Sequence, residues 1–155
     1  MRDAIFRFII FLSINFGALA IGIVFTNIGV PSEWYIGLSK APWTPPGWFF
    51  GFAWSTIMLC FSLYLTCLWP RVKNKKTLHC LFLIQWVLNV SWNPIFFYYH
   101  NIWGGLIIIS SLTVLIGVFL RFYLHAIKAK TFLLLPYFIW LLIATSLNGY
   151  ILFYN

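Results

Sequence analysis

Residues 47–69 read GWFFGFAWSTIMLCFSLYLTCLW and carry no charged side chain. The hydrocarbon core of a bilayer is about 30 Å thick, and a helix needs about 20 predominantly apolar residues to cross it. This run is long enough to do so. It follows Pro45-Pro46, and proline is tolerated in the first turn of a helix but not in its interior. Residues 47–69 are therefore predicted to form a membrane-spanning helix.

One similar apolar run precedes this stretch and three follow it. The five predicted spans are 5–28, 47–69, 78–99, 104–124 and 132–154. Strands of a membrane barrel would alternate apolar and polar residues with period two, and these runs do not. The predicted fold class is all-α, an integral membrane bundle of five transmembrane helices. Residues 1–155 are expected to form a single domain, with a long first loop at 29–46.

The composition points to the same class of protein. Hydrophobic residues make up 63% of the chain and charged residues 8%, whereas a soluble domain has about 25% charged residues. With so few charges the chain cannot cover its surface in water, so its main partner is predicted to be the lipid bilayer. The net charge of +8 comes from Lys and Arg at the ends of the runs, which is typical of membrane topology. Nucleic acid is not a predicted partner.

The basic residues also predict the orientation. Nine of the ten Lys and Arg residues lie near the N-terminus, in residues 71–76 or in residues 121–130, and five spans place these segments on one face. Lys40 is alone on the other face. By the positive-inside rule, the N-terminus is cytoplasmic, and the 29–46 loop and the C-terminus lie on the opposite face. The low acid content and the lack of a targeting signal favour a bacterial plasma membrane.

The first run has a competing interpretation. Arg2 and Arg7, the apolar stretch after them and the small residues 18–20 resemble a cleaved signal peptide. The apolar run continues past this point without the polar start that mature chains usually have, so a retained helix is favoured. Small residues would then allow helices to approach closely, and the spacing of Ala18 and Gly22 allows a homodimer.

Ionisable side chains are scarce where chemistry would need them. No Asp, Glu or Lys lies within a predicted span, whereas ion-coupled transport normally leaves such a residue at membrane depth. Asp3 and Glu33, the only acids, lie on opposite faces, so no carboxylate pair is available for acid–base catalysis. The cysteines lack metal-ligand spacing, and the interfacial histidines are more often solvated than haem ligands, so no metal site is predicted. These residues are Cys60, Cys67, Cys80, His79, His100 and His125.

Neutral polar groups share one face of the third run. The spacing i, i+4, i+7, i+8 brings together Gln85, Asn89, Trp92 and Asn93. A buried amide needs a hydrogen-bond partner, so this face must point to other helices or to a cavity and not to lipid. Asn15 and Asn148 are the predicted counterparts. The amides either join helices or line a ligand pocket, and Trp92 on the same face favours the pocket.

Two tryptophans are predicted to lie deep in the membrane. Trp54 falls well inside the second run and Trp140 well inside the fifth. An interfacial aromatic belt accounts for Trp48, Trp69 and Trp103. An indole at membrane depth has an N–H that needs a partner, so Trp54 and Trp140 indicate the walls of an internal chamber; large aromatics also fill bundle cores.

The motifs along the chain resemble one known family. They are Trp34 with Leu38, Lys40 and Trp43-Thr44-Pro45-Pro46; Phe50-Gly51 with Trp54; Gln85, Leu88-Asn89 and Trp92-Asn93-Pro94-Ile95-Phe96-Phe97; and Pro136-Tyr137 with Trp140, Ala144-Thr145 and Leu147-Asn148. In this order on five spans, they are similar to the tryptophan-rich sensory protein/translocator protein (TspO/MBR) family. The resemblance implies a five-helix bundle, often dimeric, with a pocket beneath the first loop that binds protoporphyrin IX or haem-like tetrapyrroles.

The resemblance also implies a set of pocket residues. Carried over by motif, the ligand-binding residues are Tyr35, Trp43, Pro45, Trp54, Asn89, Trp92, Trp140, Ala144 and Leu147. Lys40 is predicted at the pocket rim, where its ammonium meets a propionate or only reaches to the interface. The prolines of the 29–46 loop are expected to hold it extended and stiff, as a lid. No cofactor is expected to be required beyond the bound tetrapyrrole.

Three features depart from the family pattern. Ala41 replaces the proline that commonly follows the lysine, and Gly51-Phe52-Ala53-Trp54 lacks the proline of the usual entry to the second helix. These changes affect the expected shape of the lid. Animal members also bind cholesterol, through a motif in which a basic residue follows a tyrosine, and no basic residue follows Tyr150. Sterol transport is therefore not predicted.

Three functions follow from the resemblance. The favoured one is a membrane receptor for tetrapyrroles with a sensory, scavenging or regulatory role. The second is an enzyme that degrades porphyrin in light, with Trp54 and Trp140 as redox partners. The third is a transporter of small lipophilic molecules. The sequence favours binding, because it holds neither a coupling-ion site nor a nucleotide-binding motif.

Overall fold

The computed structural model describes residues 2–155, which form helices joined by short connections. The long helices are α1 (Arg2–Gly29), α3 (Gly47–Leu68), α4 (Lys75–Asn93), α5 (Ile102–Ile127) and α6 (Leu135–Tyr154). The short elements are α2 (Glu33–Gly37), the π-helix η1 (Pro94–Tyr98) and the 3-10 helix η2 (Lys128–Leu134). No strand occurs within residues 2–155, and the predicted all-α fold class is confirmed.

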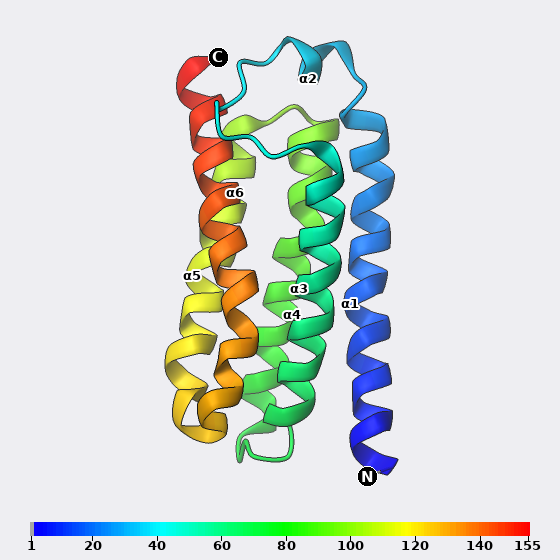
Figure 1. Ribbon diagram of the computed structural model, residues 1–155, viewed down its shortest axis with the longest axis vertical. Helices are drawn as coiled ribbons and strands as arrows, with labels where there is room; N and C mark the ends of the chain where they lie inside the picture. The colour runs from blue at the N-terminus through cyan, green and yellow to red at the C-terminus, as the bar shows by residue number, and fades with distance from the viewer. Residues whose placement is uncertain (1) are drawn as a thin grey trace.

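Four continuous helical stretches are long and apolar enough to cross a membrane. The last of them, Ile102–Tyr154, has 53 residues and folds back on itself at η2 (Figure 1), so it supplies both α5 and α6. All five predicted spans are therefore present as helices, with ends that differ by a few residues from the predicted bounds.

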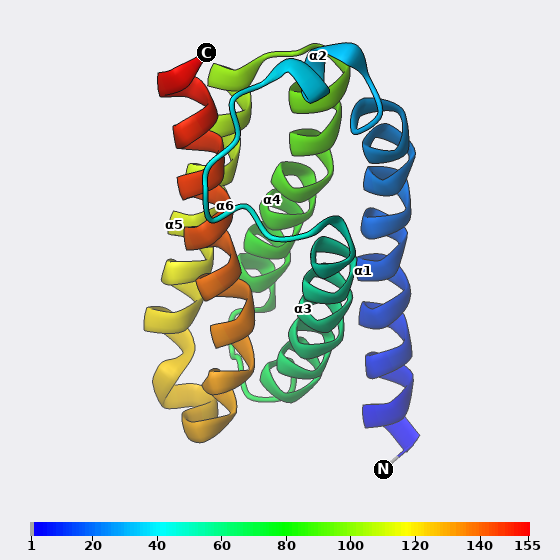
Figure 2. The ribbon, with the colours of Figure 1, turned by 45° about the horizontal axis from the view of Figure 1, so that its top comes forward.

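The five long helices lie side by side along the long axis, and α2 crosses one end of the bundle (Figure 1). Contacts join α1 to α3 and α4, α4 to α5, α5 to α6, and α6 back to α3. The helices therefore form a closed ring. The segment between α2 and α3 passes beside α6 before it enters α3 (Figure 2), so the first loop spans the ring.

The two ends of the bundle differ in charge. The N-terminus, the 69–74 loop and η2 lie at one end, which we call the basic end; α2 and the C-terminus lie at the other, which we call the lid end (Figure 1). The three basic segments that were predicted to share a face do so. The direction in which the bundle crosses the membrane, the bacterial plasma membrane and the homodimer stay predictions.

Side-chain caps set two of the helix starts. Asn74 Oδ1 accepts the backbone N–H of Thr77 (3.1 Å), so α4 begins at Lys75, earlier than predicted. Lys75 thus belongs to the helix and not to the connection between the second and third spans. Asn101 Oδ1 accepts the N–H of Gly104 (2.8 Å) at the start of α5. Such caps satisfy N–H groups that have no partner inside the helix.

Three details of the connections and helix ends differ from the expectations. The 29–46 loop is not extended throughout, because Ser32 Oγ accepts the N–H of Tyr35 (3.2 Å) and starts the short helix α2. The connection expected between the spans 104–124 and 132–154 is not an open loop, because most of it folds as the 3-10 helix η2. The third span does not continue as an α-helix to its end: it changes to the π-helix η1 at Pro94, which has no N–H to donate into α4.

The core lies between the helices, and the outer surface is apolar. The most deeply buried large side chains include Phe61, Tyr64 and Phe119, each 0% exposed. Large apolar side chains also face outward: Val114 is 68% exposed and Phe122 is 74% exposed. A soluble monomer rarely exposes a large apolar surface, and lipid tails are the solvent that such a surface fits.

The helix α1 packs on its neighbours through small residues and one buried polar contact. A Cβ on Gly22 would lie 2.6 Å from Asn93 Nδ2 on α4, and Ala18 is 4% exposed. This spacing therefore serves packing within the chain and gives no separate indication of a homodimer, which stays a prediction. Asn15 Nδ2 donates to Ser62 Oγ on α3 (2.9 Å), so Asn15 is not a counterpart of the α4 amides.

Candidate functional site

A buried phenol in the interior joins α4 to α6. The Tyr137 hydroxyl accepts hydrogen bonds from Gln85 Nε2 (2.8 Å) and Asn89 Nδ2 (3.2 Å). All three side chains are buried, and we call them the Tyr137 cluster. Tyr137 is missing from the predicted site residues. Its Pro-Tyr motif was visible in the sequence, but nothing in the spacing showed that the two amides would share one acceptor.

Trp92 forms a second link from α4 to α6. Its Nε1 donates to Asn148 Oδ1 (3.1 Å), and Asn148 Nδ2 donates to the backbone carbonyl of Ile102 (3.2 Å). The prediction that Asn148 is a counterpart of the polar face of α4 is confirmed. Asn93 turns towards α1 instead, where its Oδ1 accepts a hydrogen bond from Thr26 Oγ1 (2.9 Å).

The two deep tryptophans lie among other aromatic rings. Trp140 is 4% exposed and contacts Phe49 and Phe50 of α3, with ring centroids 5.8 and 5.3 Å apart. Trp54 meets Tyr137 edge-on, with the centroids 6.2 Å apart. Both indoles therefore belong to an aromatic layer between α3 and α6, next to the Tyr137 cluster.

Two buried polar atoms in this region have no hydrogen-bond partner within residues 2–155. They are Trp140 Nε1 and Gln85 Oε1. Turning the Gln85 amide would exchange its oxygen and nitrogen without adding a partner, so one of the two atoms stays unpaired. A buried unpaired group costs about 1–3 kcal/mol, and nearly all such groups in native proteins are paired. The Trp140 N–H and the Gln85 amide are therefore left without a full set of partners within residues 2–155.

Aromatic packing holds the α2 end of the lid. Tyr35 contacts Phe96 and Phe97 of η1, with centroids 6.3 and 5.4 Å apart, and Trp92 stacks on Phe96 at 5.1 Å. Burial raises the pKa of the Tyr35 phenol above its ordinary value. Lys40 Nζ lies 4.6 Å from the centre of the Tyr35 ring, so the cation predicted at the rim sits over the lid itself.

Hydrogen bonds between neutral groups hold the other end of the lid to α6. Trp43 Nε1 donates to Ser146 Oγ (3.1 Å), and its ring meets Tyr150 edge-on at 5.5 Å. The Asn155 side chain accepts the N–H of Ser39 (2.8 Å) and donates to its carbonyl (3.3 Å). Trp43 is 54% exposed, so this attachment lies at the surface.

The predicted site residues fall into three groups: residues near Tyr137, residues that pack against η1, and residues on or beside α6. Their members are Trp54, Asn89 and Trp140; Tyr35 and Trp92; and Trp43, Ala144 and Leu147. Pro45 is half-buried in the segment between α2 and α3. Their role in binding a ligand stays a prediction.

The site offers aromatic faces and neutral hydrogen-bonding groups. Within the part of the chain that the structure describes, no three His, Cys, Asp or Glu side chains gather so that they could hold a metal ion. Indole and phenyl rings provide stacking surfaces, while the amide groups and the indole N–H provide directional contacts. This arrangement fits non-covalent binding of a flat, largely apolar molecule.

Fold and site together define a class: a five-helix membrane protein whose aromatic interior is covered at one end by a loop. The sequence profile of the TspO/MBR family matches residues 9–154, and the chain belongs to this family.

Relatives of the chain occur in distant organisms. It is 35% identical over 116 residues to the tryptophan-rich protein TspO of Archaeoglobus fulgidus. The aligned region covers 74% of this chain and 75% of the relative. It is 29% identical over 122 residues to the protein CrtK of Rhodobacter capsulatus, 76% of each chain. It is 31% identical over 123 residues to the translocator protein of Homo sapiens, 75% of this chain and 71% of the relative.

Proposed function

We propose that this membrane protein is a receptor for a tetrapyrrole of the protoporphyrin IX kind, bound beneath the lid with a sensory, scavenging or regulatory role. The observation that carries the proposal is the pair of unpaired buried groups, the Trp140 indole N–H and the Gln85 amide. A bundle that needed only to be stable would gain by pairing or replacing them, because each costs free energy in the ligand-free protein.

A tetrapyrrole could supply the hydrogen-bond partners that the Trp140 N–H and the Gln85 amide lack. Its inner nitrogens supply both N–H donors and acceptors, and its carboxylates are strong acceptors for an indole N–H. Its flat face would stack on the indoles of Trp54 and Trp140, which already lie edge-on or tilted against other rings. The Asn89 amide, held on Tyr137, is a further donor next to them.

The lid supplies the remaining contact. Lys40 is its cation, and its ammonium rests on the Tyr35 ring, from which it can turn to a carboxylate at the membrane surface. A long lysine side chain makes this movement at little cost, because it is already partly exposed. A relative named tryptophan-rich sensory protein, in Cereibacter sphaeroides, fits a sensory role.

The proposal predicts the effect of Trp140→Phe on binding. In the dark, purified protein in detergent is titrated with protoporphyrin IX, and tryptophan quenching and the porphyrin absorption shift are followed. Wild type should bind saturably, and Trp140→Phe should bind about tenfold more weakly, because one hydrogen bond to the ligand is lost. The same change should alter the thermal unfolding midpoint only slightly, because the loss of an unpaired buried N–H offsets part of the packing lost with the larger indole.

Trp103→Phe is the matched control, because this indole is 64% exposed at the start of α5. It should bind like wild type. Non-saturable partitioning, identical in all three proteins, would rule out the tetrapyrrole site. Repeating the titration in light separates a receptor from a porphyrin-degrading enzyme, since only the enzyme converts bound porphyrin to products at a rate that depends on Trp54 and Trp140. Flux of porphyrin into sealed vesicles tests the transporter alternative.

A further inference from the structure

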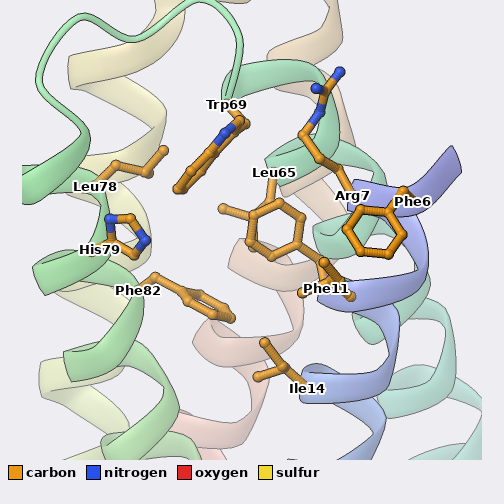
Figure 3. Close-up of a pocket in the computed structure, with 10 residues that line it drawn as sticks. Phe6, Arg7, Phe11, Ile14, Leu65, Trp69, Leu78, His79 and Phe82 are labelled. Carbon is orange, nitrogen blue, oxygen red and sulfur yellow. The ribbon is translucent and has the colours of Figure 1, made fainter. Parts of the chain in front are cut away.

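A second candidate site lies at the basic end of the bundle. A cavity of about 300 Å³ opens between α1, the end of α3 and the start of α4 (Figure 3). This volume is at the lower limit of ligand pockets, which hold about 300–1,000 Å³. Apolar side chains form most of its wall, including Phe11, Ile14, Leu65 and Phe82. None of the residues predicted to bind the tetrapyrrole lines it.

Arg7 is the charged residue of the cavity. Its Nε is buried and has no hydrogen-bond partner within residues 2–155. Figure 3 shows its guanidinium on the side towards Trp69 and the loop after α3, whereas Ile14 and Phe82 lie on the opposite side. The cavity is therefore polar towards the end of the bundle and apolar further inside.

Two other basic side chains are fixed beside Trp69, which forms part of the wall. Lys75 Nζ donates to the Trp69 carbonyl and lies 4.9 Å from the centre of its ring. His79 Nδ1 donates to the Lys75 carbonyl (2.9 Å), and its ring meets Trp69 edge-on at 4.8 Å. These contacts fix the Lys75 and His79 side chains beside Trp69.

We propose that this cavity binds one anionic phospholipid, with its phosphate on the Arg7 guanidinium and one acyl chain against the apolar wall. Arginine binds phosphate through two parallel N–H groups, one of which can be the Nε that lacks a partner here. Basic pockets between membrane helices recognise anionic headgroups. The order from cation to apolar wall matches the order from headgroup to acyl chain in a bilayer.

General attraction of lipid to a basic surface is the alternative that the test must separate. It would depend on the total charge of this end of the bundle and not on Arg7. Arg121 provides the comparison, because it lines a different cavity, with Lys128, at the same end. The two arginines carry the same charge on opposite sides of the bundle, and Trp69 lines only the cavity of Arg7.

Trp69 makes the site measurable. The protein is placed in phosphatidylcholine vesicles that contain increasing fractions of phosphatidylglycerol with brominated acyl chains, and bromine quenches an indole that it contacts. A parallel series uses brominated phosphatidylcholine. The fluorescence of Trp69 is the difference between each protein and the same protein carrying Trp69→Phe. Wild type should reach half-quenching at an about fivefold lower fraction of the anionic lipid, the preference expected for one added cation–phosphate contact.

Arg7→Gln should bring the two quenching curves together, Arg7→Lys should keep most of the separation, and Arg121→Gln should keep all of it. An unchanged circular dichroism spectrum shows that the variants are folded. Equal quenching of wild type by both lipids would overturn the proposal. So would a loss of preference in Arg121→Gln as large as that in Arg7→Gln, because general surface charge would then explain the effect.

Discussion

Tyr137→Phe should lower the free energy of unfolding by about 2–4 kcal/mol, although it removes a single oxygen atom. That oxygen accepts the hydrogen bonds of both Gln85 and Asn89. Without it, two buried amides lose their acceptor. Each amide N–H then stays buried without the hydrogen bond that would offset its desolvation free energy. The phenylalanine ring fills the same space, so the loss measures hydrogen bonding and not packing.

The free energy can be measured by titration with sodium dodecyl sulfate in mixed micelles. Tyr154→Phe is the control on the same helix, because its side chain is 64% exposed, and it should unfold like wild type. Adding Gln85→Leu to Tyr137→Phe should recover part of the loss, since replacing both partners by apolar groups removes one unpaired amide. If Tyr137→Phe were as stable as wild type, the Tyr137 cluster would not be what joins α4 to α6.

Gly29→Ala is expected to cost about 3 kcal/mol, the upper end of the usual range for overpacking. A Cβ at this position would lie 2.3–2.5 Å from Phe97, with the Cβ of Phe97 itself at 2.4 Å. Phe97 is 7% exposed and cannot simply turn away. The end of α1 would have to move from η1, and because Phe97 packs on Tyr35, the lid would move with it. Porphyrin binding should weaken together with stability.

Gly17→Ala is the matched substitution on the same helix. An added Cβ there has nothing within 4 Å, and alanine is the better helix former by about 1 kcal/mol. Its thermal unfolding midpoint should equal or exceed that of wild type, while that of Gly29→Ala falls by several degrees. Equal midpoints for the two variants would show that α1 is free to shift from η1 and that the contact does not fix the lid.

The long helices could be predicted from the sequence because apolar length is a strong signal. Residues 47–69 contain no charge, and the helix runs from Gly47 to Leu68. The polar face of α4 was also visible, because residues at i and i+4 on a helix share a side, and Gln85 and Asn89 do meet one partner. The length of the apolar runs therefore predicted the helices, and the spacing of polar residues predicted which face of α4 is buried.

The parts that could not be predicted depend on single atoms or on distant partners. The short helix α2 rests on the Ser32 hydroxyl, a cap that the nearby prolines obscured. Asn15 finds Ser62 instead of an amide of α4, a choice made by how α1 and α3 pack. The unpaired N–H of Trp140 is a property of the assembled core, which no spacing along the chain reveals.

The two attachments of the lid differ in strength, and this decides how it can move. Tyr35 is fixed on the buried rings of Phe96 and Phe97, whereas Trp43 and Ser39 are held by a few hydrogen bonds at the surface. Surface hydrogen bonds exchange readily with water, while buried aromatic contacts do not. We therefore expect the loop to open as a flap from the α6 side, with its hinge at η1. Because the contacts on the α6 side join neutral groups, the opening should not depend on salt concentration or pH.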